Sequence, residues 1–430
     1  MTASSPTSSP ATLVLSGLDE VRSWAADFYR DLHAHPELSH QEQATAAKVI
    51  QRLSNSGIEV HAGIGDTGVV GLVRNGEGPT VLLRADMDAL PIAEGTGLEY
   101  ASNTTAIDET GNEVPVMHAC GHDMHVTWLL GAAHLLSAAR GNWSGTLVVI
   151  FQPAEETGDG ARSMVKDGLT GLIPKPDVAL AQHLLPFSAG LVGTRSGPIL
   201  SGADSIRITL HGRGAHGSVP QASVDPVVLA AMVVVRLQTI MAREMQPGEP
   251  VVVTVGRLQA GTKSNVIPDH ATIEVNVRTY KEQTRTSVLR IIRRIVDAEC
   301  TASGSPQPAD YELFDRFPIT NNDDKSNAVV TAAFTSFFGE RTQALSMQTA
   351  REDFSDIPDA FGTPYCYWGV GGIDPDTYRK AEKEDRVSED IPVNHSARFA
   401  PVLQPTHDTG IEAMVVATLA WLGQPNTRNQ

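Results

Sequence analysis

Cysteine is scarce in this sequence: Cys120, Cys300 and Cys366 are the only three among 430 residues. So few cysteines exclude a disulfide scaffold and fit a protein of the reducing cytosol. Basic residues are also in short supply, because 33 Lys and Arg stand against 50 Asp and Glu, for a formal net charge of −17. Without a basic surplus to displace counterions, the chain is not expected to bind nucleic acid.

Long hydrophobic runs are missing as well. The longest, residues 227–235, has about half the length of a membrane-spanning helix, so no membrane association is expected. The N-terminal sequence MTASSPTSSPAT has neither the basic nor the apolar region of a signal peptide. Its Ser, Thr and Pro residues cannot bury much apolar surface, which predicts a disordered tail over residues 1–14.

The 41% of hydrophobic residues suffices for buried cores, and the length predicts two or three domains. In residues 15–197, helix-like segments alternate with nearly continuous apolar runs such as TVLLRAD (80–86), TLVVIFQ (146–152) and DVALAQH (177–183). Such runs are typical of strands buried on both faces. The alternation predicts an α/β domain with a largely parallel central sheet flanked by helices.

Further along the chain the pattern changes. Segments such as SIRITLHG (205–212) and ATIEVNVRT (271–279) alternate apolar and polar residues, as half-exposed antiparallel strands do. We therefore predict a small inserted α+β domain over residues 198–310. The α/β pattern then returns, so that residues 15–197 and 311–430 together form the first domain.

The strongest local signal is MHACGHDMHV (117–126), which holds Cys120, His122, Asp123 and His125 within six residues. A thiolate, imidazoles and a carboxylate suit a borderline-soft divalent metal, with zinc the first choice and manganese, cobalt or nickel as alternatives. The competing interpretation is a helix start with polar capping groups. Four metal-competent side chains in so short a segment favour the metal site.

A second signal is FQPAEETGDG (151–160), in which Glu155 and Glu156 follow the most apolar predicted strand. In open α/β sheets, ligands bind at the carboxyl ends of the strands. One glutamate could ligate a metal while the other acts as general base on a water molecule. For this motif alone, an ordinary acidic loop is an equal alternative.

Isolated residues extend the possible site. His183 ends a predicted strand, and His395 lies in IPVNHSARF in the last third of the chain. A lone histidine is most often an ordinary polar residue, but a metal site gathers its ligands from distant segments. Asp86 and Asp88, in RADMDALP, also follow a strand and could orient a ligating imidazole. A simple turn is the alternative for that segment.

Taken together, these motifs closely resemble those of the metal-dependent amidohydrolases related to hippurate hydrolase. Relatives of that family include aminoacylases, carboxypeptidase G and the plant auxin-conjugate hydrolases. The resemblance extends over nearly the whole chain, from RDLHAHPELS (30–39) to FAPVLQP (399–405). It rests on the ordered motifs RADMDALPI, MHACGHDMH, FQPAEE, GRGAHGSVP (212–220), SNVIPD (264–269), REDFS (351–355) and VNHSARFAP (393–401).

The resemblance implies a catalytic α/β domain with an inserted lid domain, and a site for two divalent metal ions. Cys120 would bridge both ions, and the remaining implied ligands are His122, Glu156, His183 and His395. Glu155 would be the general base and acid, and Asp88 would orient a ligand. The implied reaction is hydrolysis of the amide bond of an N-acyl amino acid or a similar small amide.

The resemblance also implies roles for lid residues. His216, in GRGAH, would reach across a lid-mediated homodimer and polarise the scissile carbonyl, while Asn265 and Arg278 would hold the substrate's carbonyl or carboxylate. Asp159 and Arg351 depart from the pattern of the family. Both departures could alter the substrate pocket. The identity of the acyl group and of the amino acid is therefore not inferred from any one relative.

Three alternatives remain. The same metal chemistry would serve a dipeptidase or exopeptidase. A nucleophilic Cys120 paired with His118 or His122 is disfavoured, because it leaves Glu155 and Glu156 without a role. An inactive metal-binding scaffold is disfavoured because every ligand position is intact.

Overall fold

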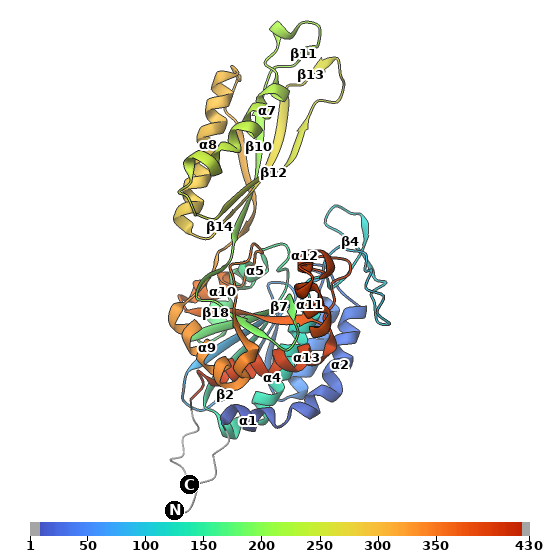
Figure 1. The fold of residues 1–430 in the computed structure, drawn as a ribbon, viewed down its shortest axis with the longest axis vertical. Coiled ribbons are helices and arrows are strands. Elements are labelled where there is room, and N and C mark those ends of the chain that lie inside the picture. The colour runs from blue at the N-terminus through green and yellow to red at the C-terminus, as the bar shows by residue number, and fades with distance from the viewer. Residues whose placement is uncertain (1–8, 424–430) are drawn as a thin grey trace, which may run out of the picture. The chain divides into compact units, whose positions relative to one another are not determined.

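The structure is a computed structural model that describes residues 9–423 (Figure 1). The chain divides into two compact units. Unit 1 contains the described residues up to Ile199, residues 322–346 and the described residues from Asp353 onward. Unit 2 contains Leu200–Asn321 and Met347–Glu352. The predicted fold class, an α/β domain with an inserted α+β domain, is confirmed.

Unit 1 is built on a mixed sheet of eight strands in the order β1-β2-β6-β3-β7-β18-β8-β17. The four central strands β6, β3, β7 and β18 run parallel, whereas β1, β2 and β8 add antiparallel pairs. The strands are β1 (Glu59–Ile64), β2 (Gly68–Asn75), β3 (Thr80–Asp86), β6 (Gly145–Gln152), β7 (Val178–Ser188), β8 (Val192–Thr194), β17 (Thr342–Ala344) and β18 (Tyr365–Ile373).

Helices α4 and α13 lie side by side against β3, β7 and β18 (Figure 1). Helix α4 is apolar on nearly every face, as expected of a helix buried in a core. The helices of unit 1 are α1 (Pro10–Leu15), α2 (Leu18–Ala34), α3 (Gln43–Asn55), α4 (His122–Ala138), α5 (Gly160–Lys166), α6 (Leu169–Leu172), α9 (Asp324–Phe338), α10 (Asp356–Phe361), α11 (Pro375–Lys383), α12 (Val387–Asp390) and α13 (Leu403–Leu419).

Helix α1 begins within the segment that the sequence predicts as a disordered tail, and that prediction is wrong for residues 10–14. Ser9 caps the helix by accepting a hydrogen bond from the Thr12 amide, and Pro10 occupies the first turn, where its missing N–H costs nothing. Val14 is buried in the core of unit 1. This apolar contact holds the helix, and the Ser, Thr and Pro content of the segment gave no sign of it. Residues 1–8 lie outside the described part.

Unit 2 is an antiparallel sheet in the order β12-β14-β10-β15 with α7 and α8 packed against it. Along β14, buried and partly exposed residues alternate, as the sequence predicted. Its elements are β10 (Gly202–His211), α7 (Pro226–Leu237), β12 (Val251–Ala260), β14 (His270–Thr279), α8 (Glu282–Ala302) and β15 (Asp310–Phe317), with the short strands β11 (Ala215–His216) and β13 (Val266–Ile267).

Unit 2 is longer than the predicted insertion of residues 198–310. Strand β15 completes its sheet, and its charged sequence DYELFDRF lacks the alternation that marks the other strands. Residues 347–352 also return to this unit, where the Ser201 amide donates to the Ala350 carbonyl (3.0 Å) and Arg351 pairs with Asp315 (2.7 Å). This ion pair gives Arg351, unusual at its position, a structural partner.

The remaining short elements are β4 (Thr105–Ile107), β5 (Glu113–Pro115), β9 (Gly197–Leu200), β16 (Thr320–Asn322), η1 (Arg140–Asn142), η2 (Pro220–Ala222), η3 (Ile240–Glu244) and η4 (Gly339–Arg341). Within residues 9–423, none of the helices combines the length and apolar character that a bilayer crossing requires. All three cysteines are buried free thiols.

The contact between α13 and α4 generates a stability prediction. A Cβ atom at Gly410, on α13, would lie 2.1 Å from the indole of Trp128, which is fully buried on α4. Gly410→Ala should therefore lower the free energy of unfolding by about 1–3 kcal/mol, although alanine itself favours a helix by up to about 1 kcal/mol. Urea denaturation measures this change.

The matched control is Gly141→Ala, since a Cβ atom there meets no other atom within 4 Å. We expect this variant to be as stable as the wild type. Equal stability of both variants would show that α13 and α4 can separate without cost.

Candidate metal centre

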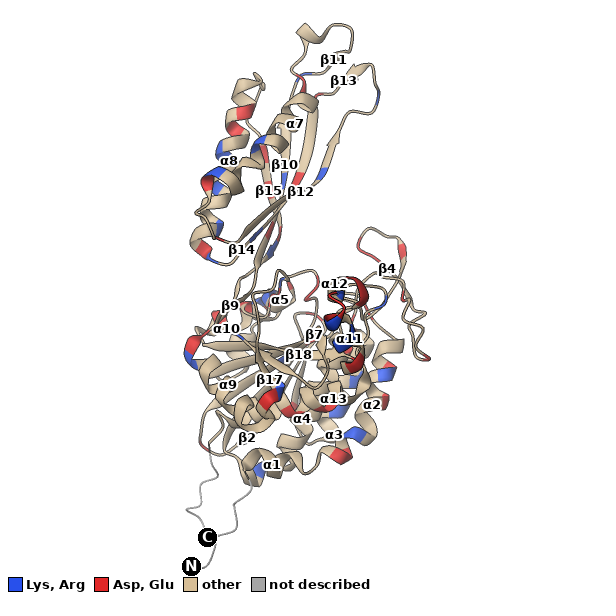
Figure 2. Cartoon of the chain, viewed as in Figure 1, with Lys and Arg blue, Asp and Glu red and all other residues tan. Residues whose placement is uncertain are grey.

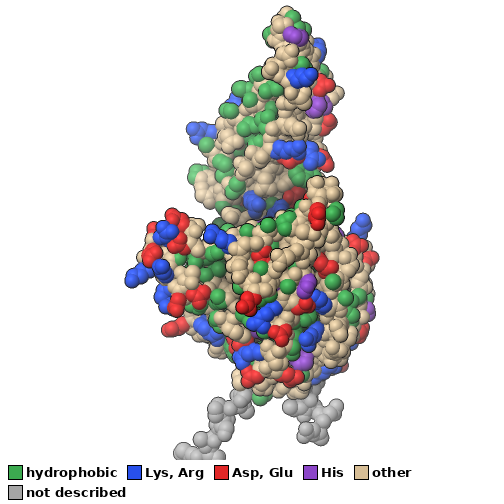
Figure 3. All heavy atoms as spheres, turned by 90° about the vertical axis from the view of Figure 1, so that its right-hand side faces the viewer, with side chains coloured by type: hydrophobic (Ala, Val, Ile, Leu, Met, Phe, Trp, Pro, Cys, Tyr) green, Lys and Arg blue, Asp and Glu red, His purple; other side chains and the backbone are tan. Residues whose placement is uncertain are grey.

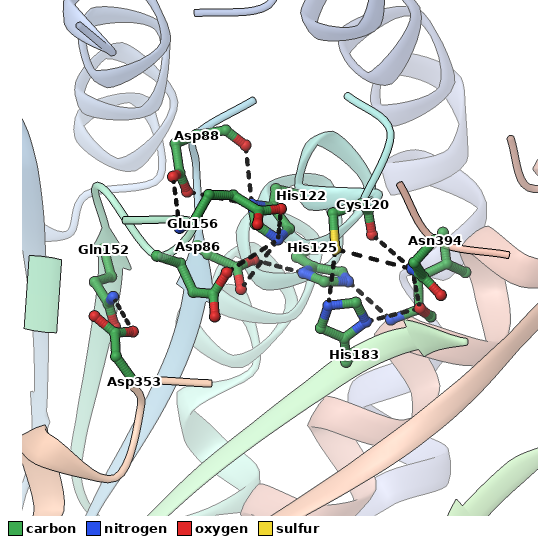
Figure 4. A network of polar contacts seen from close by, with 12 residues as sticks. Asp86, Asp88, Cys120, His122, His125, Gln152, Glu156, His183, Asp353 and Asn394 are labelled. Carbon is green, nitrogen blue, oxygen red and sulfur yellow. Dashed lines mark hydrogen bonds and ion pairs between the residues drawn. The ribbon is translucent and has the colours of Figure 1, made fainter. Parts of the chain in front are cut away.

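The candidate centre lies at the carboxyl edge of the central parallel strands. Strands β3 and β6 end in register, with Asp86 opposite Gln152. Strand β7 pairs with the other side of β3 and carries His183, just beyond the last paired residues. Parallel strands bring their carboxyl ends to one edge, so the loops after β3 and β6 meet there with the first turn of α4. Figure 4 shows these side chains converging.

A glycine makes the sharp turn that places Cys120 and His122 side by side. Gly121 has φ 87°, a left-handed conformation that favours glycine, and precedes the first residue of α4. A Cβ atom there would lie 2.5 Å from Leu184, on β7. The turn thus depends on glycine for both its backbone conformation and its close approach to the sheet.

The predicted metal ligands of unit 1 form groups that share Cys120. One group is Cys120, His122 and His183, and a second is Cys120, Glu156 and His395, each with its ligand atoms within 4.8 Å of one another. Cys120 Sγ lies 3.4 Å from His183 Nε2, and Glu156 Oε1 lies 3.2 Å from His395 Nε2. The sulfur therefore stands between two sets of nitrogen and oxygen donors.

Two of these donor atoms, His122 Nε2 and Glu156 Oε1, are buried, lie 3.9 Å apart and make no hydrogen bond of regular geometry among the described residues. Glu156 Oε1 has only the ion-pair contact with His395 Nε2. Buried polar atoms nearly always have a hydrogen-bond partner, so these two atoms indicate a missing ligand between them. A divalent cation would satisfy both, and the mixture of sulfur, imidazole and carboxylate is one that zinc binds.

The electrostatics of the centre favour a cation. Burial alone would lower the pKa of His122, but Asp86 and Asp88 outweigh it and raise the pKa to about 10. For His183, burial and the nearby His125 hold the pKa well below its usual range, so the imidazole is neutral and able to ligate. The carboxylates thus create a negative potential that draws positive charge into the centre.

Hydrogen bonds on the far side of each imidazole orient the nitrogen that faces the centre. His183 Nδ1 donates to the Leu184 carbonyl (2.7 Å), which leaves Nε2 directed at Cys120. His122 Nδ1 lies 2.9 Å from the Asp88 carbonyl oxygen and 3.3 Å from its carboxylate. Outer partners of this kind fix the tautomer of a metal-binding histidine. Asp88 thus contacts the imidazole that it was predicted to orient.

His125 has a different place, although the sequence grouped it with the metal-competent residues. Its Nδ1 donates to Asp86 (2.5 Å), and its Nε2 accepts a hydrogen bond from the Leu184 amide (2.8 Å). Both ring nitrogens are occupied, so His125 connects β3 to the segment that carries His183. Asp86 in turn accepts from Arg84 Nη1 (2.6 Å).

Sequence reasoning missed several polar side chains around the centre. Asn394 donates through Nδ2 to the carbonyls of Cys120 (3.2 Å) and Leu184 (3.1 Å), tying three donor-bearing segments together (Figure 4). Arg84 is fully buried and contacts Asp86 and Asp353. A charged residue inside the apolar run VLLRAD was the available signal, because a buried arginine needs carboxylate partners.

The surroundings of Cys120 disfavour the alternative of a cysteine nucleophile. Burial, and after it the charges of Glu156 and Glu155, raise the pKa of the thiol well above its usual range, whereas a nucleophilic cysteine needs a lowered pKa. The proposed partner His118 is buried, and neither of its ring nitrogens has a hydrogen-bond partner in the described part of the chain. A bound cation would reverse the effect of the carboxylates on the thiol.

Glu155 lies at the edge of the donor cluster. Its side chain is nearly buried, and Oε2 is 3.9 Å from His122 Nε2. Asp159, the additional acid of this loop, contacts His40 Nε2 (3.0 Å) and accepts from Thr157 Oγ1 (2.7 Å). This acid therefore has its own partners, separate from the sulfur-containing groups.

The three predicted lid residues belong to unit 2. His216 on β11 pairs with Val266 on β13, directly beside Asn265. Arg278 lies on β14, where it donates to the Thr349 carbonyl and to Asn276. The structure thus brings His216 and Asn265 together within unit 2, and their roles toward a substrate remain predictions.

Comparisons with known proteins agree with this geometry. Hippurate hydrolase of Campylobacter jejuni is 37% identical over 331 residues, covering 75% of this chain and 82% of the relative. Thermostable carboxypeptidase 2 of Saccharolobus solfataricus is 38% identical over 308 residues, 70% of this chain and 75% of the relative. A solved dinuclear metal binding peptidase of family M20 from Bacillus subtilis aligns with TM-score 0.75 and 28% identity, over 94% of this chain and 99% of its own.

The sequence profile of one family matches residues 82–396, which include every side chain of the sulfur-sharing groups. The match spans most of the chain and both units. The protein therefore belongs to peptidase family M20/M25/M40.

Proposed function

We propose that the protein hydrolyses the amide bond of N-acyl amino acids or similar small amides, using two divalent metal ions. The observation that carries this proposal is the pair of ligand groups that share Cys120. The similarity to hippurate hydrolase supports the N-acyl amino acid as substrate class. The products are a carboxylic acid and an amino acid or amine.

Cys120, His122, Glu156, His183 and His395 would hold the two ions, with Cys120 common to both candidate ligand groups. The donor set suits zinc, manganese, cobalt or nickel. When bound, such ions polarise a carbonyl and lower the pKa of water, which makes water a nucleophile near neutral pH. The dinuclear peptidase of Bacillus subtilis, whose fold this chain shares, supports two ions rather than one.

Glu155 moves the proton. It lies beside the ligands, yet it belongs to neither of the groups that contain Cys120. Its carboxylate takes a proton from the attacking water as the water oxygen bonds to the carbonyl carbon. It then gives this proton to the nitrogen as the carbon–nitrogen bond breaks. Asp88 serves as a positioning residue through His122 Nδ1.

His216 polarises the substrate carbonyl in this mechanism. Its Nδ1 accepts a hydrogen bond from the Ser218 amide (3.2 Å), so the N–H donor of the ring is on Nε2. An exposed Nε2–H is a donor suited to a developing oxyanion. Asn265 and Arg278 would hold the carbonyl or carboxylate of the substrate, and the guanidinium keeps N–H donors beyond those given to Thr349 and Asn276.

The protein forms a homodimer through unit 2 in this proposal. Helix α7 exposes Val228, Met232 and Val235 on one face, at helical spacing. It packs beside β12, an edge strand of the sheet. Figure 2 shows α7 nearly without charge while α8 carries many charges, and Figure 3 shows hydrophobic side chains gathered on unit 2. An apolar face beside an unpaired strand edge suits a second copy of the chain.

A metallo-exopeptidase is the second candidate function, favoured by the similarity to thermostable carboxypeptidase 2. The same residues would cleave a peptide bond. A panel of N-acetyl amino acids, N-benzoyl amino acids and dipeptides, tested with each of the four metals, separates the two functions. Turnover of dipeptides alone would favour the exopeptidase.

Replacing the proposed general base tests the mechanism. Glu155→Gln keeps the size of the side chain but cannot accept a proton, so kcat should fall at least about 1,000-fold. The content of bound metal, measured by elemental analysis, should stay at the wild-type value. A variant with near-normal kcat would disprove the role of Glu155.

The two ligand groups give different expectations for metal content. Cys120 belongs to both groups and His395 to one. Loss of the shared ligand should therefore weaken metal binding at both sites, and loss of His395 at one. We expect Cys120→Ala to retain far less than about one ion per chain and His395→Ala to retain about one. Elemental analysis after dialysis measures the ratio. Equal ion content in both variants would contradict a thiolate shared by the two ligand groups.

The dimer is tested on the apolar face of α7. Val235→Lys places a charge on that face and should convert a dimer to a monomer in light-scattering measurements, since an unpaired charge at an interface costs several kcal/mol. The control is Leu313→Lys, because Leu313 is similarly exposed on β15 at the other edge of the sheet. A monomeric wild type, or a Leu313→Lys variant that dissociates equally, would contradict this interface.

A further inference from the structure

Glu42 is a buried carboxylate in unit 1 that the proposed mechanism does not use. It occupies the N-cap position of α3, where a side chain normally accepts a hydrogen bond from its own helix, yet it makes no such bond. Instead, Oε1 accepts from the amides of Ala154 (2.9 Å) and His40 (3.0 Å), and Oε2 accepts from Thr67 Oγ1 (2.6 Å).

The contact with Ala154 reaches the loop that carries the paired glutamates. Ala154 directly precedes Glu155 and has φ 51°, a left-handed conformation that is unfavourable for a residue other than glycine. A strained conformation persists only where its surroundings hold it. The Ala154 amide is held by Glu42, and its carbonyl accepts from the Gly160 amide (3.1 Å).

The other side of the glutamate pair is held as well. Asp88 Oδ2 accepts from the Glu156 amide (2.9 Å), a contact visible in Figure 4, and from Ser39 Oγ (2.6 Å). Ser39 and Glu42 both belong to the segment between α2 and α3. This segment therefore holds the loop at two points. Glu42 contacts the Ala154 amide directly, and Ser39 contacts the Glu156 amide through Asp88.

We propose that Glu42 is a positioning residue for the Glu155–Glu156 pair: its carboxylate holds the left-handed turn at Ala154, which points Glu156 at the metal ions and Glu155 at the reacting water. This inference rests on the proposed function. It gives a reason for the burial of a carboxylate at this position. Burying a carboxylate costs free energy unless hydrogen bonds compensate, and here those hydrogen bonds hold the loop.

A purely structural role would be to stabilise the start of α3. Glu37 already performs that role, because its Oε1 accepts from the Ala44 amide (3.0 Å) and its Oε2 from the Thr45 amide (2.8 Å). Glu37 and Glu42 are thus two carboxylates of one segment, each accepting backbone N–H bonds. One is directed at the helix and the other at the loop of the glutamate pair, which makes Glu37 a matched control.

The test compares Glu42→Met, which keeps the length of the side chain but accepts no strong hydrogen bond, with Glu42→Gln, whose amide oxygen can still accept from Ala154. Glu37→Met is the control. Binding of Co²⁺ alone is followed by its visible absorption spectrum, and kcat and KM are measured on the N-acyl amino acid panel. Thermal unfolding reports stability for every variant.

We expect Glu42→Met to weaken Co²⁺ binding and lower kcat, each by about 10–100-fold, while KM changes less than about threefold. Glu42→Gln should restore both to within about threefold of the wild type, because it keeps the acceptor. Glu37→Met should lower the unfolding temperature while Co²⁺ affinity and kcat stay within about twofold of the wild type.

Wild-type Co²⁺ affinity and kcat in Glu42→Met would overturn the proposal, as would equal losses in Glu37→Met or a Glu42→Gln variant as impaired as Glu42→Met. If Glu42→Met does not fold, Glu42→Asp decides in its place, because the shorter carboxylate cannot reach Ala154 and should show the same losses. A wild type that binds Co²⁺ but hydrolyses no member of the panel refutes the proposed function instead, and the Co²⁺ comparison still judges Glu42.

Discussion

The candidate metal centre depends on hydrogen bonds made on the far side of its donors. His183 and His122 each use one ring nitrogen on a protein oxygen, which directs the other nitrogen toward Cys120. His125 uses both of its nitrogens to join Asp86 to the Leu184 amide. Without these bonds, the side chains from α4, β7 and the loop after β6 would not be held with their donor atoms toward a common point.

The same arrangement concentrates negative charge in a buried place. Asp86, Asp88, Glu155 and Glu156 lie around His122, and the first two outweigh burial and raise the pKa of the imidazole. Such a cluster would oppose folding through desolvation and mutual repulsion if it stayed without a counterion. Arg84 offsets part of this charge at Asp86, and divalent ions would offset the remainder. Metal affinity and the stability of unit 1 are therefore linked.

How far the sequence predicted the site can be seen in individual residues. Cys120 and His122 were recognisable because metal-competent side chains are dense in their motif, and the predicted ligands do meet in one place. His125 belongs to the same motif, yet its nitrogens are used within the protein, a difference that spacing alone cannot show. Asn394 and Glu42 carried no local signal, because their partners lie on segments distant in sequence. Strand β15 was assigned to the wrong unit since its charged sequence does not alternate.

The α/β class, the insertion and the donor chemistry could be predicted from the order of the amino acids, because apolar periodicity and residue type are local properties. The folded chain was needed to see which donors share Cys120, which histidine nitrogens are available, and what holds the turn before Glu155. These features depend on contacts between segments far apart along the chain. The direction of each hydrogen bond is set by the register of parallel strands and by helix packing, which no local pattern encodes.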